Sequence, residues 1–135
     1  MLTRKAGRIA ALLVTALFAS ATQSQIALVM SPGATPLTKA QIVNLYLGRA
    51  KDLKLLDLPE DSPAREVFYR KAVERDQAQM KAIWSRIVFT GKGQPPTEVP
   101  DSSAVKKAVA AQPNVVGYID KSAVDASVKV VLFLD

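Results

Sequence analysis

The sequence predicts a single α/β domain, in which about four strands form a small, mostly parallel or mixed sheet with flanking helices. Short apolar runs alternate along the chain with segments of helical periodicity, which is the pattern of a sheet covered by helices. The run 128–134 (VKVVLFL) is apolar at nearly every position, which predicts a strand covered on both faces. A length of 135 residues leaves room for one domain.

Each element follows from its local pattern, taken in chain order. Strands are expected at residues 26–30, 53–58, 115–119 and 128–134. Helices are expected at residues 37–47, from Ser62 onward, from Asp76 to Gly91, and at residues 101–111. Residues 91–96 (GKGQPP) predict a rigid loop.

Three of the helix starts are well specified. Thr38 with Gln41, and Asp76 with Gln79, have the spacing of a capping box, in which each side chain accepts a hydrogen bond from the backbone N–H of the other residue. Ser62 stands at an N-cap position, followed by proline at the first helical position. These signals predict where the helices begin without reference to the rest of the fold.

The N-terminus has the pattern of a secretory signal peptide. Arg4, Lys5 and Arg8 precede the uncharged run 9–18, and the sequence Ala-Ser-Ala at 19–21 matches an A-x-A cleavage site. The run is about half the length that a membrane-spanning helix requires, roughly 20 residues. We therefore expect an exported protein without a stable membrane span once the signal is removed.

Composition excludes several functional classes. Cleavage of residues 1–21 leaves one domain, 22–135, with 15 Lys and Arg against 12 Asp and Glu, a net charge of +3 without a basic cluster for nucleic acid. The chain contains no cysteine and no histidine, so Ser–His–Asp and Cys–His catalysis and Cys/His zinc sites are impossible. The sequence indicates no cofactor, no metal site and no catalytic residue. An enzyme is the least favoured class, since nothing sets two carboxylates together among Asp57, Glu60, Asp61, Asp120 and Asp125.

Four stretches in order resemble the phosphate-type periplasmic solute-binding proteins. They are residues 37–48 (LTKAQIVNLYLG), 60–68 (EDSPAREVF), 84–96 (WSRIVFTGKGQPP) and 116–119 (VGYI). The resemblance covers essentially the whole chain after residue 21 and implies one lobe of a type II periplasmic binding protein fold. It also implies a periplasmic location and a link to ABC-type phosphate uptake.

The resemblance also implies a binding site at Ser62 and Arg65. In the family this loop opens a helix and offers hydroxyls, backbone N–H groups and an arginine to phosphate. Here Pro63 and Ala64 stand where the family has glycine and threonine, which removes one backbone donor and one hydroxyl. In the family two lobes close on the ligand, whereas this chain supplies one.

Two alternatives stay open at this point. Arg65 lies four residues after Asp61 and five after Glu60, so an ion pair with either carboxylate would account for it without a ligand. The whole domain is also compatible with a protein–protein interaction module of the cell envelope, which keeps the lobe but has lost its solute and binds a partner or a second copy. Trp84 is expected in the core, and Tyr118 is expected to pack with its hydroxyl at the rim of the sheet.

Overall fold

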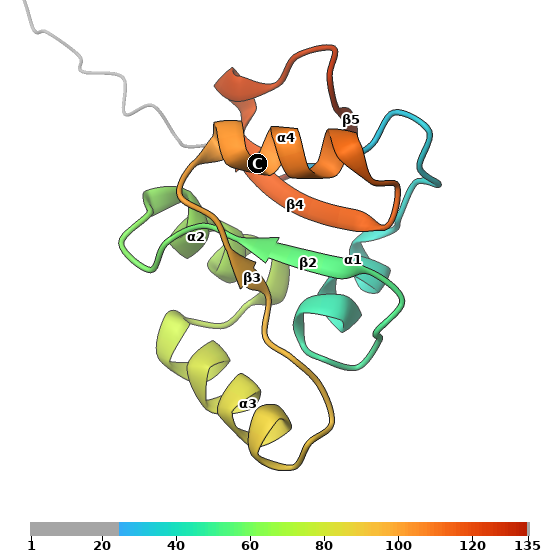
Figure 1. The fold of residues 1–135 in the computed structure, drawn as a ribbon. Coiled ribbons are helices and arrows are strands. Elements are labelled where there is room, and N and C mark those ends of the chain that lie inside the picture. The colour runs from blue at the N-terminus through green and yellow to red at the C-terminus, as the bar shows by residue number, and fades with distance from the viewer. Residues whose placement is uncertain (1–24, 135) are drawn as a thin grey trace, which may run out of the picture.

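The structure is a computed structural model that describes residues 25–134. In these residues five strands form one sheet in the order β3-β2-β4-β1-β5, with helices on both faces (Figure 1). The strands are β1 (Ile26–Met30), β2 (Lys54–Asp57), β3 (Thr97–Glu98), β4 (Val115–Asp120) and β5 (Lys129–Leu134). The helices are α1 (Lys39–Tyr46), α2 (Pro63–Phe68), the π-helical turn η1 (Tyr69–Val73), α3 (Gln77–Phe89), α4 (Ser102–Ala111) and the 3₁₀ turn η2 (Lys121–Ala123).

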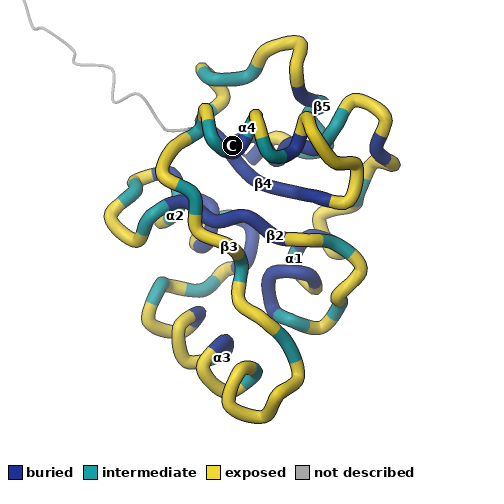
Figure 2. The backbone as a smooth tube through the Cα atoms, viewed as in Figure 1, coloured by how far each residue is buried: buried dark blue, intermediate teal, exposed yellow. Residues whose placement is uncertain are grey.

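The sheet is mixed, as predicted. β1 is antiparallel to β4 and β5, whereas β2 is parallel to both β4 and β3. Because β2, β3 and β4 run in the same direction, their carboxyl-terminal ends lie on the same side of the molecule, at one end of the strands. The central strands are the most apolar, and every residue of β1 is at most 2% exposed (Figure 2).

Successive residues of β4 show how the layers pack. Side chains alternate between the two faces of a strand. Gly117 faces α4 so closely that an added Cβ would lie 2.6 Å from Cγ1 of Val105. The next residue, Tyr118, stacks on Phe68 of α2 with ring centroids 4.1 Å apart. The sheet therefore lies between α4 on one face and α2 on the other, which confirms the predicted three-layer α/β lobe.

The predicted helix starts form as the sequence indicates. Thr38 and Asp76 each make both bonds of a capping box, with Gln41 and Gln79 respectively. Ser62 is the N-cap of α2, with Pro63 in the first turn, but its hydroxyl makes no capping hydrogen bond.

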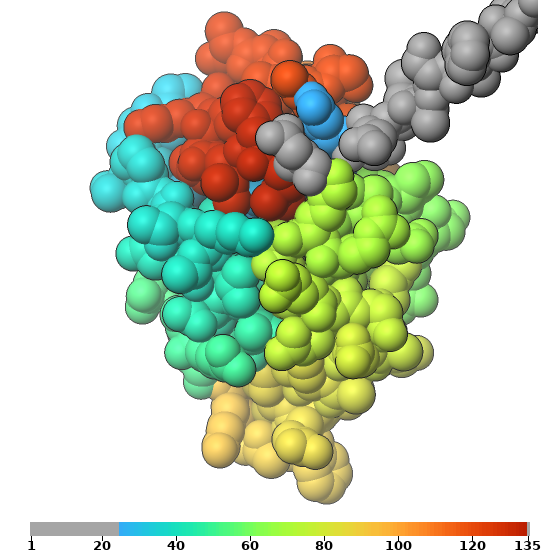
Figure 3. Space-filling view, turned by 180° about the vertical axis from the view of Figure 1, so that it is seen from behind, coloured from blue at the N-terminus to red at the C-terminus, as the bar shows by residue number. Residues whose placement is uncertain are grey.

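Strand β5 corrects one prediction. Residues 128–134 were expected to be covered on both faces, but β5 is an edge strand that pairs with β1 alone. Most of its residues are half-buried, Phe133 is 48% exposed, and the strand lies open at the surface (red, Figure 3). An apolar run does not reveal its neighbours, so a central strand and an apolar edge strand have the same signature.

Helix α3 carries an apolar stripe that extends beyond the core. Met80 and Trp84 are buried, as the helical spacing predicts. The stripe continues to Val88, which is 49% exposed, and the adjacent Phe89 is 92% exposed. Figure 1 shows α3 extending away from the sheet, and in its last turn Ile87 packs against the core while Val88 and Phe89 stay exposed.

The predicted signal peptide lies outside the described residues, and so does its cleavage site. Within residues 25–134, no helix is long and apolar enough to cross a membrane.

Candidate functional site

A buried carboxylate lies at the carboxyl end of β2. Asp57 is 4% exposed and is the buried charged residue of the described chain. The hydroxyls of Tyr69 and Tyr118 donate to its two oxygens. The Tyr118 oxygen also accepts the backbone N–H of Leu58 at 3.0 Å. A buried carboxylate requires such hydrogen-bond partners, since burying an unpaired charge would lower the stability of the fold by roughly several kcal/mol.

Burial dominates the electrostatics of this cluster. Loss of solvent raises the pKa of Asp57 above its usual value, while the hydroxyls of Tyr118 and Tyr69 and the Arg65 charge act in the opposite direction. Burial and the neighbouring carboxylate raise the pKa of both tyrosines. Both phenols therefore stay protonated at physiological pH and act as donors.

The structure corrects two expectations for these side chains. Tyr118 was expected to place its hydroxyl at the rim of the sheet, but the residue is 1% exposed and its hydroxyl is inside the cluster. One alternative left open for Arg65 was an ion pair with Glu60 or Asp61. Instead, its Nε lies 3.8 Å from Asp57 and its Nη1 lies 3.6 Å from Glu98, because its side chain reaches across the ends of β2 and β3.

Arg65 has few hydrogen bonds for a largely buried guanidinium. Its Nη1 donates to the carbonyl oxygen of Leu58 at 2.9 Å, and the guanidinium lies 5.2 Å from the Tyr69 ring centroid. Its Nε is buried and has no hydrogen-bond partner among the described residues. A guanidinium offers five N–H donors, and a buried donor without an acceptor is destabilising. Of the Arg65 nitrogens, Nε is therefore the one that is buried without a hydrogen-bond acceptor among the described residues, 3.8 Å from the Asp57 carboxylate.

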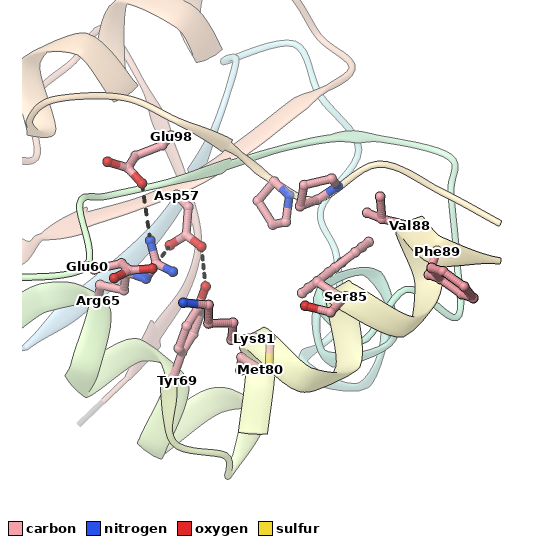
Figure 4. A pocket seen from close by; sticks show the side chains of 13 residues that line it. Asp57, Glu60, Arg65, Tyr69, Met80, Lys81, Ser85, Val88, Phe89 and Glu98 are labelled. Carbon is pink, nitrogen blue, oxygen red and sulfur yellow. Dashed lines mark hydrogen bonds and ion pairs between the residues drawn. The ribbon is translucent and has the colours of Figure 1, made fainter. Parts of the chain in front are cut away.

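An open groove of about 560 Å³ begins at this cluster, and its lining includes Asp57, Arg65, Tyr69 and Glu98. The charged side chains gather at the end next to the sheet, whereas Val88 and Phe89 lie at the other end, on α3 (Figure 4). Lys81 of α3 lies between the two ends (Figure 4), and Pro95 and Pro96 also line the groove. Trp84 lines the same groove while its Nε1 donates to the Tyr46 carbonyl oxygen at 3.0 Å. The groove therefore has a charged end and an apolar end.

Of the two residues expected at the binding site, Arg65 lines this groove, and Ser62 is not among its lining residues. Sequence reasoning missed Glu98, because a two-residue strand leaves no pattern. Asp57 was considered only as an isolated carboxylate. Its place in the apolar stretch KLLDL was a usable signal, since a charge within a buried strand needs partners from elsewhere in the fold.

The arrangement is suited to binding. Within residues 25–134 no group of three or more His, Cys, Asp or Glu side chains is placed to hold a metal ion. The groove lies at the carboxyl ends of parallel strands, where open α/β sheets generally bind their ligands. The charged end presents the Arg65 guanidinium, whose Nε has no hydrogen-bond acceptor among the described residues.

The mixed sheet with helices on both faces defines the class of protein: a single α/β lobe of the periplasmic binding protein fold. The chain is similar to an ABC-type phosphate transport receptor from Vibrio cholerae, with a TM-score of 0.60 and 19% identity. It is also similar to a putative phosphate ABC transporter substrate-binding protein with bound phosphate from Clostridium perfringens, with a TM-score of 0.62 and 21% identity. A third similar structure is PstS from Borrelia burgdorferi, with a TM-score of 0.55 and 12% identity.

Each match covers 80% of this chain but 46%, 45% and 47% of the three longer proteins, in the same order. The chain thus spans less than half of their length. At these identities the likeness shows the fold alone. No family model and no curated protein sequence matches the chain.

Proposed function

We propose that this chain is an exported, non-catalytic binding domain that holds phosphate or a similar small oxyanion at Arg65, in connection with ABC-type phosphate uptake. Signal cleavage after Ala21 would release it into the periplasm. The observation that carries the proposal is the buried Arg65 Nε without an acceptor at the mouth of the groove. The similar structures support it, since one is a phosphate transport receptor and another holds bound phosphate.

Glu98 is the internal competitor of the proposed anion. Its side chain is 56% exposed and its Oε2 lies 3.6 Å from Nη1 of Arg65, which is beyond hydrogen-bonding distance. Such an exposed, loose ion pair is worth at most about 1 kcal/mol. An oxyanion that makes direct bonds to the guanidinium would therefore displace Glu98 from Arg65. Asp57 would remain, because its oxygens are bonded to Tyr69 and Tyr118.

Ser62 has a secondary place in this proposal. Its hydroxyl makes no capping bond, so it is available as a donor if the ligand extends toward the start of α2. The groove is open to solvent and one lobe cannot enclose the ligand. We expect affinity in roughly the millimolar range, about 4 kcal/mol, which corresponds to two or three charge-assisted hydrogen bonds.

Calorimetric titration of residues 22–135 with phosphate at low ionic strength tests the proposal. Glu98→Gln removes the competing charge and is expected to tighten binding. Arg65→Lys keeps the charge but loses the planar donor fork, and is expected to weaken binding strongly. Arg70→Ala is the matched control, because Arg70 forms only an exposed pair with Glu66 at 3.9 Å on the surface of the same helical segment.

Two results would contradict this function. One is a flat titration of both the wild type and Glu98→Gln with the fold intact by circular dichroism. The other is saturable binding that Arg65→Lys leaves unchanged, since the anion would then not be held by the guanidinium fork of Arg65.

A second candidate function, the envelope protein-interaction module, is supported by β5. This six-residue edge strand is apolar after Lys129 at its start, with Phe133 48% exposed. Exposed apolar edges pair with other strands unless a charge or a proline blocks them. Self-association through β5 would appear as concentration-dependent sedimentation that Val131→Lys abolishes. A wild type that stays monomeric at every concentration would remove this candidate.

A further inference from the structure

We infer that the groove accepts an amphipathic organic anion: a phosphate or carboxylate head at Arg65, with an apolar, preferably aromatic, body along α3. This inference rests on the proposed anion site and extends it to a class of ligand. It follows from the size of the groove, from its apolar end, and from the distribution of charge in it.

The groove is larger than an inorganic oxyanion requires. Its volume of about 560 Å³ lies within the range typical of small-molecule sites, roughly 300–1,000 Å³. Phosphate has about the bulk of a few water molecules, each of which takes roughly 30 Å³ in the liquid. A phosphate at Arg65 would therefore leave most of the groove, including its whole apolar end, without contacts.

The apolar end is built by α3 and the segment after it. Met80, Trp84 and Val88 recur every four residues, so they share one face of the helix. Met80 and Trp84 pack into the core, while Val88 is 49% exposed and the neighbouring Phe89 is 92% exposed. Pro95 and Pro96, from the segment after α3, line the same groove. The core accounts for the first half of the stripe but leaves the second half uncovered.

Trp84 offers this ligand an apolar surface. Its Nε1 already donates to the Tyr46 carbonyl oxygen at 3.0 Å, so its one polar group is satisfied inside the protein. What remains toward the groove is the ring. An aromatic ligand body would stack or pack edge-on against it, which adds to the free energy of area burial.

The charge distribution determines which head the ligand carries. Arg65 has a buried N–H without an acceptor. Lys81 lines the groove between its two ends (Figure 4). Three carboxylates also line the groove: Asp57, which is bonded to two tyrosines, Glu98, which lies beside Arg65, and Glu60. A cationic head would face Arg65 and Lys81, and a neutral ligand would leave the Arg65 donor unsatisfied.

Trp84 is the single tryptophan of the chain, so its fluorescence reports directly on occupancy of the groove. We would titrate residues 22–135 with phenyl phosphate, inorganic phosphate and benzylamine, with excitation at the red edge of indole absorption. Phenyl phosphate is expected to bind about tenfold more tightly than phosphate, because its ring is removed from water at the apolar end. Benzylamine, which carries the same ring on a cation, is expected not to bind.

Phe89→Ser removes the most exposed apolar side chain of the groove and should not impair folding. It is expected to lower the affinity for phenyl phosphate toward that for phosphate and to leave phosphate binding unchanged. Val88→Ser is expected to act in the same way. Phe133→Ser is the matched control, because Phe133 is also an exposed phenylalanine but lies on β5, outside the groove.

The outcomes separate this inference from the proposed function. Equal affinity for phosphate and phenyl phosphate would overturn the inference and leave the oxyanion site standing. Preference for phenyl phosphate that Phe89→Ser and Val88→Ser do not reduce would overturn it too, since the ring would then bind elsewhere. Tighter binding of benzylamine than of phenyl phosphate would overturn the choice of an anionic head. No binding of phosphate or phenyl phosphate would overturn both.

Discussion

Removal of one hydroxyl, in Tyr118→Phe, is the sharpest test of the buried cluster. The Tyr118 hydroxyl donates to Asp57 and accepts the backbone N–H of Leu58 at 3.0 Å. Phenylalanine keeps the stack on Phe68 at 4.1 Å and creates almost no cavity. The variant therefore changes hydrogen bonding and leaves packing intact.

The expected decrease in the free energy of unfolding is large for the removal of one oxygen atom. The N–H of Leu58 would be left buried without an acceptor, at a cost of about 1–3 kcal/mol. Asp57 would lose one of its two phenolic donors, and a hydrogen bond to a charged group contributes about 1.5–3 kcal/mol. Because both effects belong to one network, they are not fully additive, and we expect a total near 3 kcal/mol.

Tyr46→Phe provides the matched control. Tyr46 is fully buried beside the same cluster, but its hydroxyl makes one neutral bond, to the carbonyl oxygen of Leu56 at 2.7 Å. Its loss should lower the free energy of unfolding by about 1 kcal/mol. In urea, where the slope is about 1–3 kcal/mol per molar, the two midpoints should differ by roughly 1 M.

Urea unfolding followed by Trp84 fluorescence measures both variants in one assay. Equal losses for Tyr118→Phe and Tyr46→Phe would refute the reasoning, because the Tyr118 hydroxyl would then make no special contribution to the buried carboxylate. A change in slope as well as midpoint would mean that the variant altered the unfolded or native ensemble, and the comparison would need hydrogen exchange at Leu58 instead.

Further predictions concern the pH dependence and the packing of the sheet. Burial raises the pKa of Asp57 in the folded protein, so the folded state holds this proton more tightly than the unfolded chain, and the resulting stability is present below about pH 4 and lost as the pH rises through the folded pKa. The free energy of unfolding of the wild type minus that of Asp57→Asn should therefore fall as the pH rises and then level off. A difference that stays constant with pH would contradict a raised pKa for Asp57. Gly117→Ala should destabilise by about 1–3 kcal/mol in thermal unfolding, because the new Cβ would lie 2.6 Å from Val105, whereas Gly33→Ala, with nothing within 4 Å, should be nearly neutral.

The order and type of the elements could largely be predicted from local sequence. The four apolar runs became β1, β2, β4 and β5, and the capping boxes at Thr38 and Asp76 formed with the partners that their spacing indicates. These features depend on residues that are near one another in the chain, so local patterns suffice to predict them. The short strand β3 was missed because Thr97 and Glu98 are held by pairing with β2, far away in the sequence.

The candidate site was only half predictable for the same reason. Arg65 could be singled out from its place in a recognisable segment, but its partners could not. The expected partners, Glu60 and Asp61, are close in sequence, whereas the observed ones, Asp57 and Glu98, come from two parallel strands. Strand pairing brings the ends of β2 and β3 together, and no periodicity near Arg65 carries that information.

The sequence by itself determined the α/β class of the fold, the lack of cysteine and histidine in these 135 residues, and where three helices begin. Local propensity and hydrophobic period set these properties. The tertiary structure alone decided that β5 is an exposed edge, that Tyr118 and Tyr69 enclose Asp57, and that Arg65 faces a groove with an acceptor missing. Those outcomes depend on which distant segments meet across the sheet, because burial and hydrogen bonding are properties of the assembled fold and not of neighbouring residues in the chain.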